Sequence, residues 1–180
     1  SVVSAKLMLM LSGVDGTTYG TTAAGWDIIA IGIAAALVTG AVWGALNGLL
    51  IALTRIQPLI VTLGTMGMAL GGAQILSGGV DVRAMPELLV TQVGSGRFLG
   101  IPMLVIIAMV TVVLAGIVLH LTRFGLHVFA VGSNEEASRR SGIPTRARLI
   151  QVYAISGLMA GIAAVMSNAR FSTTTINGHA

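Results

Sequence analysis

The chain alternates between long apolar runs and short segments that contain its charges. Four windows of 21 to 27 residues carry no Asp, Glu, Lys or Arg. About 20 apolar residues suffice for a helix to cross a bilayer. The pattern therefore predicts membrane-spanning helices at about residues 28–54, 59–77, 101–121 and 149–168. A shorter apolar run over residues 1–14, interrupted by Lys6, predicts the end of a further helix whose start is missing.

The apolar runs do not have the period of membrane strands. A barrel strand would alternate polar and apolar positions over about ten residues, whereas residues 101–121 are apolar on every side. Only 9% of the residues are charged, against about 25% in soluble domains, which excludes a water-facing surface of this size. We therefore predict an all-α, polytopic transmembrane helix bundle.

Lys and Arg favour cytoplasmic loops and so indicate orientation. We place loop 122–148 inside, together with Arg55 and with Lys6 at the inner end of the partial helix. Arg83, Arg97 and Arg170 then lie outside, so the count is seven inside against three outside. The five cations of the inner loop are Arg123, Arg139, Arg140, Arg146 and Arg148.

Small residues recur every four positions in the first window and predict close packing between helices. The stripe consists of Gly32, Ala36, Gly40, Gly44 and Gly48. Gly67-x-x-x-Gly71 and Gly157-x-x-x-Gly161 repeat the spacing. These stripes indicate a tight bundle and carry no information on substrate.

Loop 122–148 contains the signals of a two-turn helix over residues 134–141. Ser133 and Glu136 form a capping-box pattern, and Asn134 is a second possible cap. Gly142 is placed to end the helix, and Pro144 prevents its continuation. A helix this short is not stable alone in water, so it must lean on lipid headgroups, on its own bundle or on a partner.

This segment resembles the cytoplasmic coupling loop of ribose/xylose/arabinose-type permeases of bacterial ABC importers. The loop residues that match are Thr122-Arg123-Phe124-Gly125, Ala130-Val131-Gly132-Ser133-Asn134-Glu135-Glu136-Ala137 and Ser141-Gly142-Ile143. Further blocks match from Gly40 to Phe171, among them Ile56-Gln57-Pro58 and Ser156-Gly157-Leu158. The resemblance implies about half of a ten-helix type II importer permease, so we expect an internal fragment.

The resemblance also implies a function. Such a permease pairs with a second permease subunit and passes a monosaccharide from a periplasmic binding protein across the inner membrane, driven by a separate ATPase subunit. The residues expected to couple to the ATPase are Asn134, Glu135, Glu136, Ala137, Ser141, Gly142 and Ile143. A branched-chain amino-acid or nucleoside ABC permease is one alternative, and a secondary carrier or a non-transport membrane scaffold is another.

Other chemistry is poorly represented. The chain lacks a Gly-x4-Gly-Lys-[Ser/Thr] phosphate loop, so we expect ATP hydrolysis on a partner and no enzyme activity here. With three scattered His and no Cys, we expect neither a metal nor a cofactor. Among polar residues in the windows, Asn47 and Gln74 are candidates for a substrate path, with helix-to-helix hydrogen bonding as the alternative. The windows contain no Asp, Glu, Lys or Arg, which argues against a proton-coupled carrier.

Overall fold

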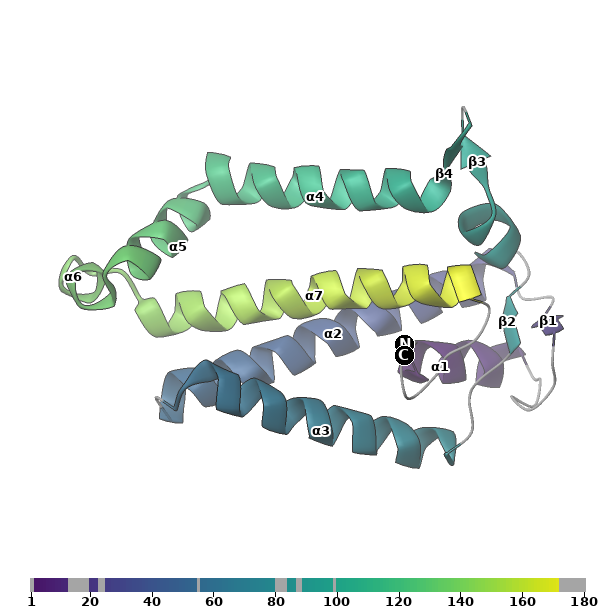
Figure 1. Ribbon diagram of the computed structural model, residues 1–180, viewed down its shortest axis with the longest axis horizontal. Coiled ribbons are helices and arrows are strands. Elements are labelled where there is room, and N and C mark those ends of the chain that lie inside the picture. Colours follow the sequence, from purple (N-terminus) through teal and green to yellow (C-terminus); the bar gives the residue numbers. More distant parts are fainter. Residues whose placement is uncertain are drawn as a thin grey trace.

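The computed structural model describes residues 2–12, 20–22, 25–54, 56–79, 84–86, 89–98 and 100–171. Four of its helices are long and apolar enough to cross a membrane, and they cover the four predicted windows. They are α2 Trp26–Thr54, α3 Pro58–Ser77, α4 Met103–Leu121 and α7 Thr145–Phe171 (Figure 1). The shorter α1, Val2–Ser12, occupies the predicted partial helix. The prediction of a polytopic helical membrane protein is confirmed.

The largest contact in the bundle joins α2 to α7, which lie side by side in Figure 1 although they are far apart in sequence. A Cβ built at Gly161 would lie 2.8 Å from the carbonyl oxygen of Ala36, and one built at Gly48 would lie 2.8 Å from the Cα of Ile150. Gly40 and Gly157 face each other in the same contact. The predicted stripe therefore packs backbone against backbone, as small residues allow.

Other predicted stripes meet different surroundings. Gly32 packs on the side chain of Met8 in α1, whose Sδ would lie 2.9 Å from an added Cβ. Within the described part of the chain and apart from the adjacent backbone of α3 itself, no atom lies within 4 Å of a Cβ placed at Gly67 or Gly71. The prediction that these two glycines pack against a helix is therefore not met by any described residue of this chain.

At one end of the bundle the connecting segments carry short elements that the sequence did not predict. A π-helix, η1 Leu89–Gly94, packs against the end of α7, where a Cβ at Gly94 would lie 2.9 Å from the carbonyl carbon of Ala169. Strand β1 Gly20–Thr22 pairs in parallel with β2 Ala84–Pro86, and β3 Arg97–Phe98 pairs antiparallel with β4 Ile101–Pro102. Ile29, Leu89 and Ala169 form a buried cluster at this end.

Lys6 lies at this same end, and its predicted position at the inner end is wrong. Its Nζ donates to the carbonyl oxygen of Leu76 in the last turn of α3, where helix carbonyls have no partner within the helix. The charge count therefore becomes six against four, which still favours loop 122–148 as the inner side. Arg55, Arg83 and the polar run 172–180 lie outside the described residues.

Candidate functional site

Loop 122–148 folds into two helices, α5 Arg123–Ser133 and α6 Glu135–Arg140, and residues 141–144 connect α6 to the start of α7. Only the second of these helices is predicted by the sequence pattern. Thr122 has an extended backbone and caps α5, because its Oγ1 accepts a hydrogen bond from the Gly125 amide at 3.4 Å. A Cβ at Gly125 would lie 2.9 Å from the Cα of Leu119, so only glycine permits this sharp turn out of α4. The apolar recurrence of Phe124, Val128 and Val131 could have revealed α5.

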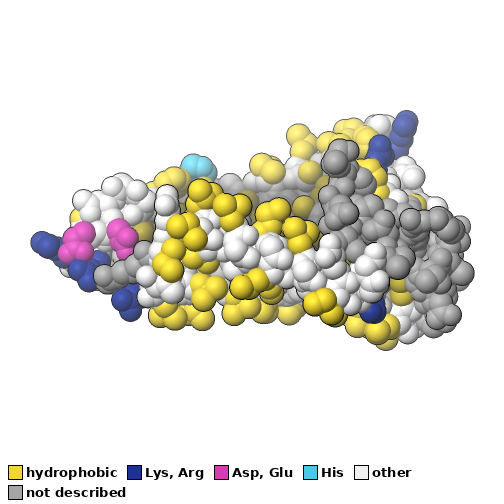
Figure 2. Space-filling view, turned by 60° about the horizontal axis from the view of Figure 1, so that its bottom comes forward, with side chains coloured by type: hydrophobic (Ala, Val, Ile, Leu, Met, Phe, Trp, Pro, Cys, Tyr) yellow, Lys and Arg dark blue, Asp and Glu magenta, His cyan; other side chains and the backbone are white. Residues whose placement is uncertain are grey.

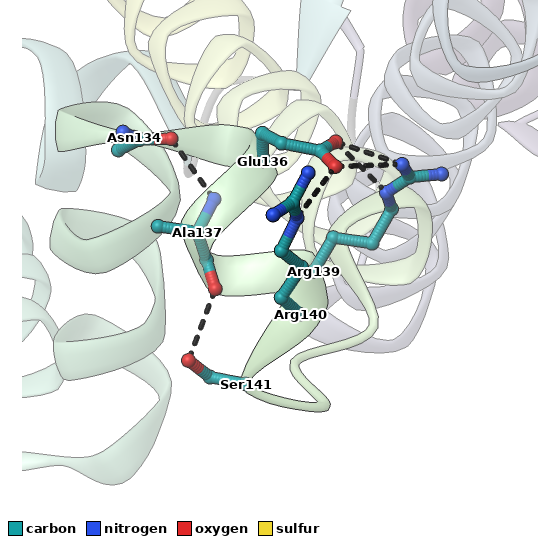
Figure 3. Close-up of polar contacts among 6 residues, drawn as sticks. All are labelled: Asn134, Glu136, Ala137, Arg139, Arg140 and Ser141. Carbon is teal, nitrogen blue, oxygen red and sulfur yellow. Dashed lines mark hydrogen bonds and ion pairs between the residues drawn. The ribbon is translucent and has the colours of Figure 1, made fainter.

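Hydrogen bonds cap both ends of the six-residue helix α6 (Figure 3). At the start, Oδ1 of Asn134 accepts a hydrogen bond from the Ala137 amide at 2.9 Å. At the end, the Gly142 amide donates to Arg139 and the Ile143 amide donates to Ser138, each at 3.1 Å. Gly142 has a φ of +82°, which suits glycine at a helix C-terminus. The predicted role of Gly142 in ending the helix is confirmed.

The predicted capping box is wrong. Ser133 belongs to the last turn of α5, where its Oγ donates to the carbonyl oxygen of Ala130 at 2.9 Å. The chain turns at Asn134, which has an extended backbone, and this turn makes Asn134 the cap of α6. The carboxylate of Glu136 instead accepts hydrogen bonds from Arg139 at 2.8 Å and from Arg140 at 3.0 Å (Figure 3).

These ion pairs set the electrostatics of α6. The guanidinium groups of Arg139 and Arg140 hold the pKa of the Glu136 carboxyl below its usual value, and Glu136 raises the pKa of Arg139. The pairs are solvent-exposed, so they shape the surface more than they stabilise it. The outer surface of α6 is therefore polar with nearly balanced charge.

α6 stands at one end of the molecule, remote from α1 (Figure 1). Its residues are exposed except Ser138, which is only 6% exposed. On the face drawn in Figure 2, acidic side chains gather at this end together with Lys or Arg, while hydrophobic side chains cover the middle. The structure thus places the seven predicted coupling residues, 134–137 and 141–143, together at this exposed end of the molecule.

A groove of about 930 Å³ lies beside α6, between it and the adjoining ends of α2, α3 and α7. Glu135, Glu136 and Arg139 line its α6 wall, and Ile51, Pro58 and Leu149 are among its apolar residues. Arg148 connects α5 with α7, because its guanidinium lies 5.6 Å from the ring centroid of Phe124 while Nη1 donates to Gln151 at 2.8 Å. The two helices that flank α6 are therefore in contact with each other through Arg148.

The two candidate path residues are not brought together. Asn47 is half-buried in α2, and its Oδ1 has no hydrogen-bond partner among the described residues. Gln74 is exposed near the opposite end of α3. Asn47 lies 7 residues before the end of α2, and Gln74 lies 16 residues after the start of α3, which runs back in the opposite direction. At about 1.5 Å of rise per residue, this difference of 9 residues places the two side chains roughly 14 Å apart along the helix direction. Among the described residues, no group of three His, Cys, Asp or Glu is placed to hold a metal ion.

Comparison with known proteins assigns the family. Residues 3–179 match the family model "Branched-chain amino acid transport system / permease component". The chain is 37% identical to the L-arabinose ABC transporter permease protein AraH of Azospirillum brasilense, with 94% of this chain and 49% of that protein covered. It is 34% identical to the ribose import permease protein RbsC of Escherichia coli K12, with 95% and 57% covered.

A third relative is the galactofuranose transporter permease protein YtfT of Escherichia coli K12, which is 37% identical over 83% of this chain and 43% of its own length. No solved structure matches the chain. The chain spans about half the length of the curated relatives that it matches. The family match covers nearly the whole chain, which therefore belongs to the permease components of the branched-chain amino acid transport system family.

Proposed function

We propose that this chain is part of the membrane permease subunit of an ABC importer that passes a monosaccharide across a bacterial inner membrane. A periplasmic binding protein delivers the sugar, a second permease subunit completes the path, and a separate subunit hydrolyses ATP. The family membership supports the permease role. The names of the relatives, which include L-arabinose, ribose and galactofuranose permeases, support a sugar as the substrate.

The observation that carries the proposal is the closed, exposed helix α6. A soluble ATPase subunit can move membrane helices only through a segment that contacts the ATPase on one side and is joined to the membrane helices on the other. α6 is short, capped by Asn134 and stopped by Gly142. α5 joins it to α4, and residues 141–144 join it to α7. A push on α6 is therefore transmitted to two membrane-spanning helices.

The charge of α6 favours a protein partner over a lipid surface. An anionic leaflet attracts clusters of Lys and Arg, whereas Glu136 neutralises much of the charge of Arg139 and Arg140. Ala137 is exposed and small, so a partner surface reaches the helix backbone without obstruction. We assign this surface to the ATPase subunit.

Two substitutions in the full-length protein test the coupling. Gly142→Val places a β-branched residue at positive φ, which misdirects the end of α6, and Ala137→Arg blocks the approach of the partner. Both variants should insert into the membrane normally but lose substrate-dependent stimulation of the ATPase. Gly142→Asn and Ala137→Ser are the matched controls, because Asn tolerates positive φ and Ser adds little bulk. Normal stimulation in both Gly142→Val and Ala137→Arg would make α6 a passive connector.

The orientation is tested separately with single cysteines in the full-length protein after removal of any cysteine outside residues 1–180, which contain none. Ser141→Cys in the exposed end of α6 should react with an impermeant maleimide only from the cytoplasm, and Ser95→Cys only from the periplasm. The reverse pattern would refute the orientation while leaving the helix assignment unaffected.

The substrate class has its own test. Uptake of labelled pentoses and hexoses by cells that express the complete transporter is expected, and an excess of branched-chain amino acids should not compete. The family description favours a branched-chain amino acid as the second candidate. Uptake of leucine without uptake of any sugar would establish that alternative.

A further inference from the structure

α5 has two apolar faces, and only one of them packs against the protein. Phe124 lies under the guanidinium of Arg148, and Val131 lines the groove beside α6. On the opposite side, Leu126 is 65% exposed and Phe129 is 51% exposed. These two side chains lie three positions apart, close to one helical turn, and so share a face. The second face therefore presents two large apolar side chains that the described part of the chain leaves more than half exposed.

This outer face continues the exposed surface of a membrane-spanning helix. Leu121, at the last position of α4, is 79% exposed, and Val118 and Leu114, about one and two turns earlier in the same helix, are also exposed. The ring of Phe129 lies 5.7 Å from that of His120 in the last turn of α4. Figure 1 shows α5 leaving the end of α4 at an angle. The exposed apolar surface of the span and that of α5 therefore meet at the end of α4, with His120 between them.

The flanks of α5 fix which side is nearer the membrane core. Gly125 lies on the flank of α5 that contacts Leu119 of α4. Arg123 is exposed at the first position of the helix and lies about 160° around it from Gly125, at the usual 100° per residue. Arg123 makes no ion pair with any described residue. The cation therefore lies on the flank of α5 that faces away from α4.

We propose that α5 is an interfacial helix: Leu126 and Phe129 lie in the upper acyl region of the leaflet in which α4 ends, and Arg123 lies at the level of the lipid phosphates. Interfacial helices bury their apolar face about 5–10 Å into the boundary between headgroups and acyl chains. Aromatic rings and long cationic side chains are favoured at this depth. The balanced polar surface of the neighbouring α6 contrasts with this apolar face, so the two short helices meet different partners.

The test measures depth in the bilayer. Leu126→Cys and Phe129→Cys are made in the full-length protein, labelled with the fluorophore NBD and reconstituted into phosphatidylcholine nanodiscs. Lipids brominated near the top of the acyl chain should remove most of the emission at both positions. Leu114→Cys in α4 is the positive control for lipid contact, and Ser141→Cys at the end of α6 should stay unquenched.

Two results would overturn the proposal. One is unquenched emission at position 126 in nanodiscs that lack the ATPase subunit. The other is loss of lipid quenching at position 126 when the ATPase subunit binds, because the outer face would then be a protein interface. For Arg123, added phosphatidylglycerol should shift the emission of the label at 126 to the blue, and Arg123→Gln should abolish the shift. A shift that survives Arg123→Gln would refute the phosphate contact. None of these readouts depends on substrate transport.

Discussion

Replacing Gly157 with alanine tests the contact between α2 and α7. A Cβ at Gly157 would lie 3.0 Å from the carbonyl carbon of Gly40 and 3.0 Å from the Cα of Gly44, and closer still to the carbonyl oxygen of Gly40. These are backbone atoms of a continuous helix, so they have no rotamer through which to move aside. α2 and α7 must separate locally to accept a single methyl group.

The expected magnitude is the balance of two terms. Alanine in a helix interior is favoured over glycine by about 0.5–1 kcal/mol, whereas overpacking a tight contact costs about 1–3 kcal/mol. The net destabilisation is about 1 kcal/mol, or roughly a fivefold change in the unfolding equilibrium. Gly116 in α4 is the matched control, because no atom of the described residues, apart from the adjacent backbone of α4 itself, lies within 4 Å of a Cβ there. Gly116→Ala meets only the favourable term and should not destabilise the protein.

The assay is unfolding of the full-length protein in mixed micelles, in which the mole fraction of dodecyl sulfate is raised and helix content is followed by circular dichroism. Gly157→Ala should lower the midpoint, and Gly116→Ala should leave it unchanged or raise it. Equal midpoints for the two variants, or a rise for Gly157→Ala, would show that the close glycine contact does not limit the stability of the bundle.

Three further outcomes are expected. Asn134→Ala should cost α6 about 1 kcal/mol and accelerate amide exchange over residues 135–140, whereas Asn134→Ser should retain the cap. Because Arg139 and Arg140 lower the pKa of Glu136, its contribution is present above the ordinary carboxyl pKa and is lost as the pH falls through the lowered value. The protection factors of the α6 amides, which are corrected for the intrinsic pH dependence of exchange, should therefore fall only in acid, and Glu136→Gln should remove that fall. Asn47→Ala and Gln74→Ala together should reduce sugar uptake; unchanged uptake would leave both as packing residues.

The membrane-spanning helices were predictable because lipid leaves few choices. Backbone groups in the bilayer must be satisfied within a helix, so a charge-free window of sufficient length predicts a span. Boundaries were less certain: α7 begins at Thr145, four residues before the predicted position. Arg146 and Arg148 therefore belong to the first turns of α7, a placement that a rule counting uncharged residues does not anticipate.

The details of the site depended on geometry that the sequence does not display. Ser133 and Asn134 both have cap chemistry, and the choice between them was decided by the end of α5. The pairing of Gly20 with Ala84 in the short sheet joins segments far apart in the chain. Lys6 met a carbonyl of a helix that starts about 50 residues later. Local patterns do not report such encounters.

The contact between α2 and α7 also constrains how the protein is made. About 90 residues lie between the end of α2 at Thr54 and the start of α7 at Thr145. At synthesis rates of about 5–20 residues per second, α2 waits roughly 5–20 seconds in the membrane before α7 emerges. During that interval Gly40, Gly44 and Gly48 are open to any other helix with a small-residue face, including α2 of a neighbouring nascent chain. Correct biogenesis therefore depends on keeping this surface apart from competitors until its own partner is inserted.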